Sequence, residues 1–204
     1  MSLSLIAYSG EKKHSNVRLL SLIALLAVST LINVLMIQRV YTLGQTITQL
    51  KNGNRLAIGA TVSALEAQSL DGSLVSLRFS EKATPTVIYV FTPQCGWCQR
   101  NINNLKALKA AASPRFNFIA VSLTEEGLEE YVRQQAFDFP VLSKLSDSTK
   151  RAFHLGSTPQ TLVIGNDNRV LKNWTGVYTG AQQKEVEDYF NVSLPGLIEA
   201  PALH

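Results

Sequence analysis

Two cysteines three residues apart, Cys95 and Cys98, are the only cysteines in the 204-residue chain. They enclose Gly96-Trp97 and follow the apolar run Thr86–Phe91. The run predicts a buried strand, and a helix is predicted to begin after it, at Cys95. On the first turn of a helix, two cysteines at this spacing can form a disulfide. The first sulfur faces unpaired backbone N–H groups and the positive helix end, which stabilise an attacking thiolate. The pattern therefore predicts thiol–disulfide exchange, with Cys95 as nucleophile and Cys98 as resolving thiol.

Other interpretations of these two cysteines stay open. A tetrahedral zinc site needs two further ligands, and the three histidines are scattered along the chain. A copper site could use Cys95, Cys98 and His154. Thr92 stands three residues before Cys95, which matches the Thr-x-x-Cys half of a peroxidase site with Cys95 as the peroxidatic cysteine. A non-catalytic, membrane-tethered binding module is a further alternative. Disulfide exchange is the interpretation that we favour, with no metal and no cofactor.

An N-terminal membrane anchor is predicted at residues 19–38, which hold no charged side chain and lie between Arg18 and Arg39. Twenty helical residues span about 30 Å, the thickness of the hydrocarbon layer. Residues 1–18 are then a cytoplasmic tail and residues 39–55 a stalk, while a cleaved signal peptide is the rival interpretation. Apolar residues at heptad spacing predict a helical stalk and allow a weak homodimer through it: Met36, Val40, Leu43, Ile47 and Leu50.

The positive charge of the chain belongs to its N-terminal part. The formal net charge is +4, of which residues 1–55 contribute +5 and residues 56–204 contribute −1. The globular part therefore lacks the basic surface that is typical of nucleic-acid-binding proteins. Between Glu81 and Glu125 there is no carboxylate, whereas Lys and Arg recur, so we expect a positive field around the helix that carries the cysteines.

Residues 56–192 predict one α/β domain. A hairpin around Asp71-Gly72 comes first. Strands follow at 86–91, 116–123, 139–142, 160–164 and 170–174, and helices at 95–112, 124–137, 147–153 and 181–190. Thr124 is the predicted N-cap of its helix. Residues 193–204 are predicted to form a loose tail.

This order of elements, with Thr158-Pro159 before the last two strands, resembles the thioredoxin fold. More narrowly, it resembles the membrane-anchored TlpA/ResA-type redoxin-domain thiol–disulfide oxidoreductases. The matching segments are IGATVSALEAQSLDGSLVSL, FTPQCGWCQRN, FPVL and LGSTPQTLVIGNDNRVLKNWTG, which cover roughly residues 58–190. The resemblance implies that Pro159 is cis and faces the cysteines, and that Thr158 offers backbone hydrogen bonds to a substrate chain. Trp97 is a further candidate for substrate contact.

The resemblance also implies an activity and a location. It implies an enzyme held by one helix in a bacterial cytoplasmic membrane, with its domain on the outer, periplasmic side. This enzyme would exchange disulfides with cysteine-containing client proteins, and we expect it to act as a reductase. Because the sequence has no flavin or nicotinamide motif, the electrons would come from a thiol partner in the membrane.

The sequence departs from the family pattern at three positions. Many relatives have Trp immediately before the first cysteine, where this chain has Gln94. Tyr89 stands in place of a buried acid six residues before that cysteine, and Asn101 in place of a Glu three residues after the second. Both familiar carboxylates are therefore missing, and the sequence leaves open which groups replace them.

Overall fold

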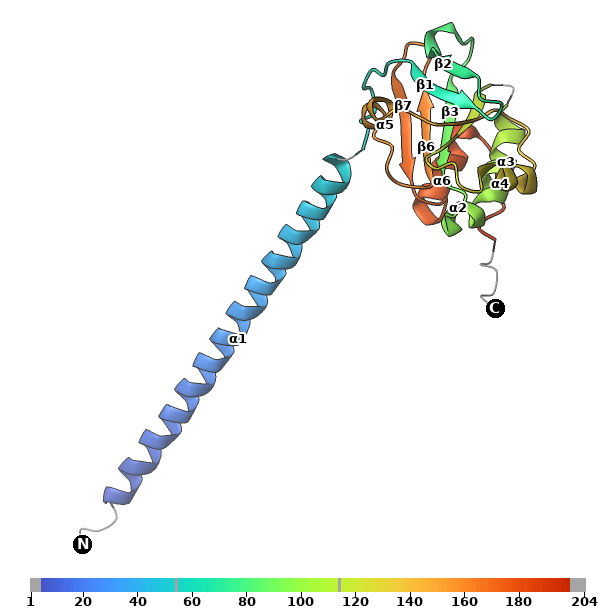
Figure 1. Ribbon diagram of the computed structural model, residues 1–204. Helices are drawn as coiled ribbons and strands as arrows, with labels where there is room; N and C mark the ends of the chain where they lie inside the picture. The colour runs from blue at the N-terminus through green and yellow to red at the C-terminus, as the bar shows by residue number, and fades with distance from the viewer. Residues whose placement is uncertain (1–4, 54, 114, 199–204) are drawn as a thin grey trace. The chain divides into compact units, whose positions relative to one another are not determined.

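The computed structural model describes residues 5–53, 55–113 and 115–198 (Figure 1). They form two units, the N-terminal helix α1 (Leu5–Gly53) and an α/β domain that follows it.

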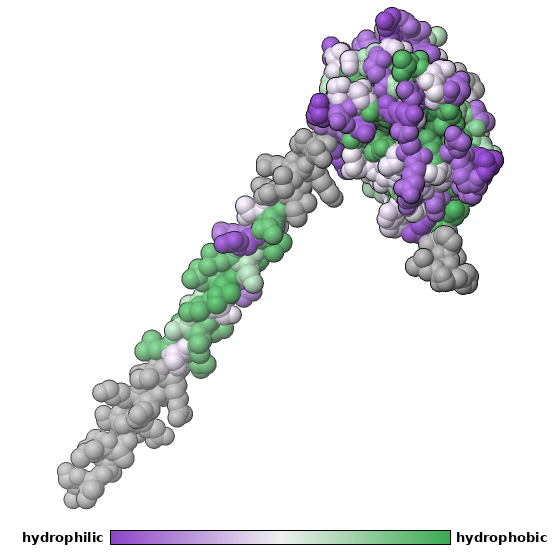
Figure 2. Space-filling model, viewed as in Figure 1, coloured by the Kyte–Doolittle hydropathy of each residue, from purple (hydrophilic) through white to green (hydrophobic). Residues whose placement is uncertain are grey.

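Helix α1 contains a segment, Leu20–Gly44, that is long and apolar enough to cross a membrane, and its most apolar stretch has a mean hydropathy of 2.5. At 1.5 Å per residue it measures about 37 Å. Its side chains are exposed, and Figure 2 shows mostly apolar ones on the visible face. Thr30 and Asn33 donate to backbone oxygens one turn earlier in the helix, which satisfies these polar groups without water.

The candidate span includes Arg39 and the first residues of the predicted stalk. Val40 and Leu43 of the predicted stalk stripe are exposed, whereas Ile47 and Leu50 lie outside the residues whose side chains are described. A homodimer through this stripe stays a prediction.

The domain is built on one seven-stranded sheet with the order β2-β1-β5-β4-β3-β6-β7. Strands β3, β4 and β5 run parallel to one another, and the remaining neighbours are antiparallel. The strands are β1 (Leu65–Ser69), β2 (Leu74–Leu77), β3 (Thr86–Phe91), β4 (Asn117–Ser122), β5 (Val141–Ser143), β6 (Gln160–Ile164) and β7 (Val170–Thr175). The mixed sheet confirms the expected thioredoxin-like α/β class.

Helices connect these strands and cover the sheet. They are a short 3-10 helix η1 (Phe79–Glu81) and the α-helices α2 (Gly96–Arg100), α3 (Ile102–Ala112), α4 (Leu128–Gln135), α5 (Asp147–Ala152) and α6 (Gly180–Phe190). In Figure 1, α2 lies at the end of the sheet opposite the β1–β2 hairpin.

Every residue of β3 is buried, so its two faces build two different parts of the core. Ile88 and Val90 pack with the hairpin strands and with Phe153, which follows α5. Tyr89 and Phe91 pack on the other face, under α2, α3 and α4. This double burial explains the unbroken apolar run in the sequence, and it holds the end of β3 rigidly beneath the cysteines.

Two helix predictions are corrected by the structure. The helix predicted over 95–112 is divided at Asn101, which separates α2 from α3. The helix predicted from Thr124 starts only at Leu128, because residue 127 is a glycine with a left-handed backbone (φ 68°) that serves as N-cap. Thr124 does not cap it; the Thr124 hydroxyl donates instead to the side-chain amide oxygen Oε1 of Gln94, at 3.4 Å.

The C-terminal segment also differs from the prediction. Residues 193–198 of the predicted loose tail are described, and they are attached to the domain. The backbone N–H groups of Gly196 and Ile198 donate to Asn104 Oδ1 at 2.8 Å and to the Arg100 carbonyl at 3.0 Å. Residues 199–204 lie outside the described part of the chain.

Candidate active site

The two cysteines lie where a buried strand passes into a helix. Cys95 follows β3 after a three-residue turn and is the N-cap of α2; its backbone N–H donates to the Thr92 carbonyl at 3.1 Å. The Cys98 N–H donates to Cys95 Sγ at 3.1 Å. The two sulfurs form a disulfide, with Cα atoms 5.2 Å apart. A sulfur that accepts a backbone N–H at a helix N-terminus is in a position that favours its thiolate.

Burial distinguishes the two sulfurs. Cys95 is partly exposed, whereas Cys98 is 0% exposed and belongs to the apolar cluster under α2. An incoming sulfur can therefore approach Cys95 and not Cys98. This order of access is the one that the sequence predicts for a nucleophile and a resolving thiol.

The Thr158–Pro159 peptide is cis, as the resemblance implies. It leads directly into β6, where Gln160 pairs with Val90 of β3, so the turn enters the sheet beside the end of β3 that carries the cysteine turn. Thr158 is partly exposed and Pro159 is buried, with the Pro159 carbonyl accepting from the Gly176 N–H at 2.8 Å. That Pro159 faces the sulfurs and that Thr158 binds a substrate backbone stay predictions.

Trp97 stands exposed between the two cysteines, at 54% of its full exposure. The Arg100 guanidinium lies 4.6 Å from the centre of its ring, within the range of a cation–π contact. Arg100 Nε also donates to the Ile198 carbonyl at 3.2 Å. The C-terminal segment therefore helps to orient the Arg100 side chain that contacts the Trp97 ring. Sequence reasoning missed this arrangement, since nothing in the local sequence links residues 100 and 198.

Gln94, the residue before the first cysteine, is hydrogen-bonded to a neighbouring loop. Its Nε2 donates to the Glu126 carbonyl at 2.7 Å, and its Oε1 accepts from Thr124 Oγ1. The residue before the nucleophile therefore links the cysteine turn to the loop that opens α4. The sequence identified the departure but not this partner.

A buried polar cluster lies behind the disulfide, where the family pattern places carboxylates. Asn101 Oδ1 accepts from Asn104 Nδ2 at 3.0 Å and from the Tyr178 N–H at 3.3 Å. Asn101, Asn104 and Tyr178 are all 0% exposed, and Tyr89 is 1% exposed. Burial raises the pKa of Tyr89 well above its ordinary value, and the nearby Tyr178 and Tyr131 act in the same direction. The cluster is therefore neutral at physiological pH.

The positive field predicted around α2 is partly neutralised. Lys109 forms an ion pair with Asp138, and this hydrogen bond lowers the pKa of the Asp138 carboxyl. Arg100, by contrast, forms no salt bridge among the described residues. It is the cation that remains beside the cysteine turn.

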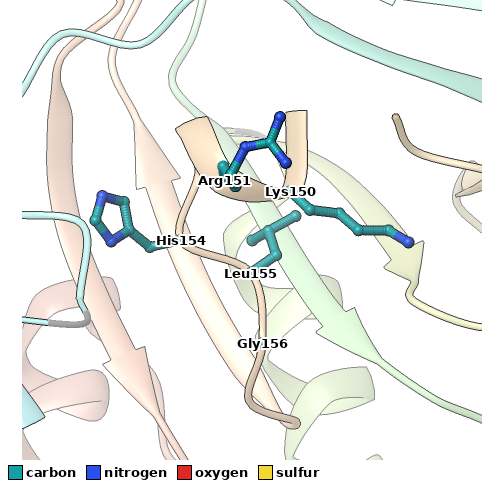
Figure 3. A pocket seen from close by; sticks show the side chains of 5 residues that line it. All are labelled: Lys150, Arg151, His154, Leu155 and Gly156. Atoms are coloured by element: carbon teal, nitrogen blue, oxygen red, sulfur yellow. The ribbon is translucent and has the colours of Figure 1, made fainter. Parts of the chain in front are cut away.

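His154, the third residue of the candidate copper site, belongs to a different feature. It lines a hollow of about 390 Å³ after α5, together with Lys150, Arg151, Leu155 and Gly156. Figure 3 shows Lys150, Arg151 and His154 pointing in different directions, so they do not converge on one ligand. Within the described part of the chain, no three His, Cys, Asp or Glu side chains group as metal ligands would.

Solved structures share this fold at low sequence identity. One is the thioredoxin domain of a thiol-disulfide oxidoreductase from Bacteroides vulgatus (TM-score 0.54, 18% identity, covering 67% of this chain and 99% of that one). Another is a thiol:disulfide interchange protein from Bacteroides sp. (TM-score 0.52, 18% identity, 67% and 91%). A third is StoA from Bacillus subtilis (TM-score 0.50, 17% identity, 62% and 98%). At these identities the likeness shows the fold alone.

Sequence comparison assigns the family. No curated protein matches the chain significantly. The AhpC/TSA family model matches residues 58–172, which run from before β1 into β7 and include both cysteines and the cis peptide. This match covers more than half of the chain. The chain therefore belongs to the AhpC/TSA family.

Proposed function

We propose that this protein is a membrane-tethered thiol–disulfide oxidoreductase that acts on client proteins through Cys95 and Cys98. The observation that carries the proposal is the pairing of a partly exposed Cys95 at a helix N-terminus with a buried Cys98 in disulfide contact. Family membership and the thioredoxin-like fold support it. The names of the similar structures, two of them thiol–disulfide oxidoreductases or interchange proteins, point to the same chemistry.

As a reductase, the protein would start with both thiols reduced. The Cys95 thiolate attacks a client disulfide, forms a mixed disulfide and expels one client thiolate. Cys98, deprotonated, then attacks Cys95 Sγ and expels the second client thiolate. The client gains two electrons, and the protein is left with the Cys95–Cys98 disulfide. A thiol partner in the membrane would reduce this disulfide again.

Client binding would use the surface around Cys95. In this proposal the Thr158 backbone pairs with an extended client segment next to Pro159, and the exposed Trp97 ring packs against a client side chain. The Arg100 contact supports a role for Trp97, because a ring held in one orientation loses less conformational entropy on binding.

The first experiment is a redox titration of the detergent-solubilised full chain. The protein is equilibrated in thiol buffers, and its free thiols are counted after alkylation. We expect a two-electron transition near about −270 mV, the level of a reductant, whereas a value near about −120 mV would indicate an oxidant. Catalytic reduction of insulin disulfides should accompany it. Peroxide consumption without insulin reduction would favour the peroxidase, and failure of the disulfide to form would favour a binding module.

We further propose that α1 anchors the chain in a bacterial cytoplasmic membrane with the domain on the outer side. The candidate span Leu20–Gly44 and the excess of positive charge in the N-terminal tail support this orientation. Alkaline phosphatase fused to the C-terminus should be active in intact cells, because it folds only outside the cytoplasm. A β-galactosidase fusion at the same residue is the matched control, and activity of that fusion instead would reverse the orientation.

A further inference from the structure

A small surface beside the cysteine turn combines a cation with two exposed apolar residues. It consists of Trp97, Arg100 and Ile198, and we call it the Arg100 patch. Trp97 is 54% exposed and Ile198 is 37% exposed. Arg100 joins them, because its guanidinium lies 4.6 Å from the centre of the Trp97 ring and its Nε donates to the Ile198 carbonyl at 3.2 Å. Tryptophan and arginine are residue types that often dominate the binding energy at protein interfaces.

The Arg100 side chain is held in place before any partner binds. The Ile198 N–H donates to the Arg100 carbonyl at 3.0 Å, so these two residues are hydrogen-bonded in both directions. The same C-terminal segment is fixed again where the Gly196 N–H donates to Asn104 Oδ1 at 2.8 Å. A side chain that is already ordered loses less conformational entropy on binding. The patch is therefore suited to recognition.

The guanidinium keeps unused hydrogen-bond donors. Arginine has five N–H donors, and the one on Nε is taken by Ile198. Nη1 and Nη2 of Arg100 form no hydrogen bond or salt bridge with the residues that the structure describes. Arg100 is partly exposed, so a partner can reach these atoms. Two parallel N–H groups of a guanidinium match the two oxygens of a carboxylate.

Acidic residues near the cysteine turn belong to its other end along the chain. Glu125 and Glu126 lie in the loop that Gln94 contacts, through a bond of 2.7 Å from Gln94 Nε2 to the Glu126 carbonyl. Glu125 is paired with a lysine at 3.6 Å, and neither glutamate forms a salt bridge with Arg100. The Arg100 patch thus keeps its positive charge and complements an acidic partner.

The patch lies within reach of a client that is bound at the nucleophile. Cys95 is the N-cap of α2 and Arg100 is its last residue, with Trp97 between them. Five residues of helix extend about 7.5 Å along the axis. An extended client segment rises about 3.3 Å per residue, so a residue two to four positions from the client cysteine lies roughly 7 to 13 Å from it.

We propose that the Arg100 patch binds an acidic side chain of the client, so that the enzyme prefers disulfides with Asp or Glu two to four residues from the cysteine that it attacks. The client carboxylate pairs with Nη1 and Nη2 of Arg100, while apolar client atoms pack on Trp97 and Ile198. The inference rests on the proposed function, in which Cys95 attacks a client disulfide, and it adds the class of client. Arg100 determines specificity in this scheme and takes no part in the exchange of sulfur bonds.

The test compares three peptides of one sequence, each with a single cysteine and each used as its symmetric disulfide dimer. They carry Glu, Gln or Lys at the third residue on both sides of the cysteine. The reduced, detergent-solubilised full chain reduces each peptide in a single turnover, and the rate constant is divided by that of the same peptide with 2-mercaptoethanol. This neutral thiol corrects for the effect of peptide charge on the disulfide itself. We expect the Glu peptide to react about threefold to fivefold faster than the Gln peptide, and the Lys peptide to be slowest.

The variant Arg100→Gln should bring the normalised ratio of the Glu to the Gln peptide to about 1. Arg151→Gln is the matched control, because it removes the same charge from an exposed arginine of α5 that forms no salt bridge among the described residues, and it should keep the ratio. Far-UV circular dichroism checks that both variants are folded.

Three results would overturn the proposal: a wild-type chain without preference for the Glu peptide, an Arg100→Gln chain that keeps the preference, or an Arg151→Gln chain that loses it equally. The first of these needs no variant. Failure of the proposed function looks different, since none of the three peptides would then be reduced. Failure of this inference alone leaves all three reduced at similar normalised rates.

Discussion

Replacing Cys98 with serine is expected to leave the chain covalently attached to its client. Cys95 is the accessible sulfur, so it can still attack a client disulfide and form the mixed disulfide. Resolution then lacks the second sulfur, which the fold holds with its Cα 5.2 Å from that of Cys95. Such positioning gives intramolecular reactions very high effective concentrations, so we expect turnover to fall at least about a thousandfold. Non-reducing electrophoresis with insulin as the client, followed by mass spectrometry of the linked peptides, measures the adduct.

Cys95→Ser is the matched control for this experiment. It should lose turnover to the same extent but accumulate no adduct, since Cys98 is buried in the folded domain. The double variant sets the background. The assignment of roles is wrong if the adduct forms on Cys98 in the Cys95→Ser chain and fails to form in the Cys98→Ser chain.

Raising the pH above about 10 is expected to unfold the domain cooperatively, because three buried tyrosines must ionise. Burial raises the pKa of Tyr131 to about 12, and it raises the pKa values of Tyr89 and Tyr178 above their ordinary value as well. An unfolded tyrosine titrates near about 10, so the stability that these groups contribute is fully present below that pH and is lost as the pH rises through their folded pKa values. When a folded pKa exceeds the unfolded one by 1, the difference corresponds to about 1.4 kcal/mol of folding free energy for that tyrosine.

The measurement follows tyrosinate absorbance at about 295 nm and far-UV circular dichroism along the same alkaline titration. We expect part of the absorbance change to coincide with the loss of secondary structure. Tyr178→Phe removes one buried phenol and should shift that step to higher pH, whereas Tyr41→Phe, at an exposed position in α1, should not. Complete tyrosine ionisation near about pH 10 in a protein with native dichroism would contradict the burial of these hydroxyls.

The features that sequence alone could predict are those with a local cause. The strand Thr86–Phe91 was expected at its observed bounds because both of its faces are buried, which requires an unbroken apolar run. The cysteine pair was predictable because its chemistry depends on a three-residue spacing at a helix start. The family resemblance supplied the cis Thr158–Pro159 peptide, which spacing alone does not specify.

The features that sequence missed depend on residues far apart in the chain. The division of the predicted helix at Asn101 accompanies side-chain bonds to Tyr178 and to Asn104, and no local pattern predicts the first of these. The attachment of the C-terminal segment depends on Arg100 and Asn104, which lie far earlier in the chain, as the bonds of Ile198 and Gly196 show. The later start of α4 is the exception, because its cause is local: the left-handed Gly127 replaces the expected threonine cap.

The placement of the two tryptophans gives the protein an optical signal of its own. Trp97 is exposed beside the disulfide, whereas Trp174 is 4% exposed and packs against Tyr189 and Phe190 in a separate part of the core. A disulfide quenches the fluorescence of an adjacent indole, so emission from Trp97 should follow the oxidation state of the cysteines. Emission from Trp174 should stay constant and serve as an internal reference. A single sample can thus report both the redox state of the site and the integrity of the fold without any added dye.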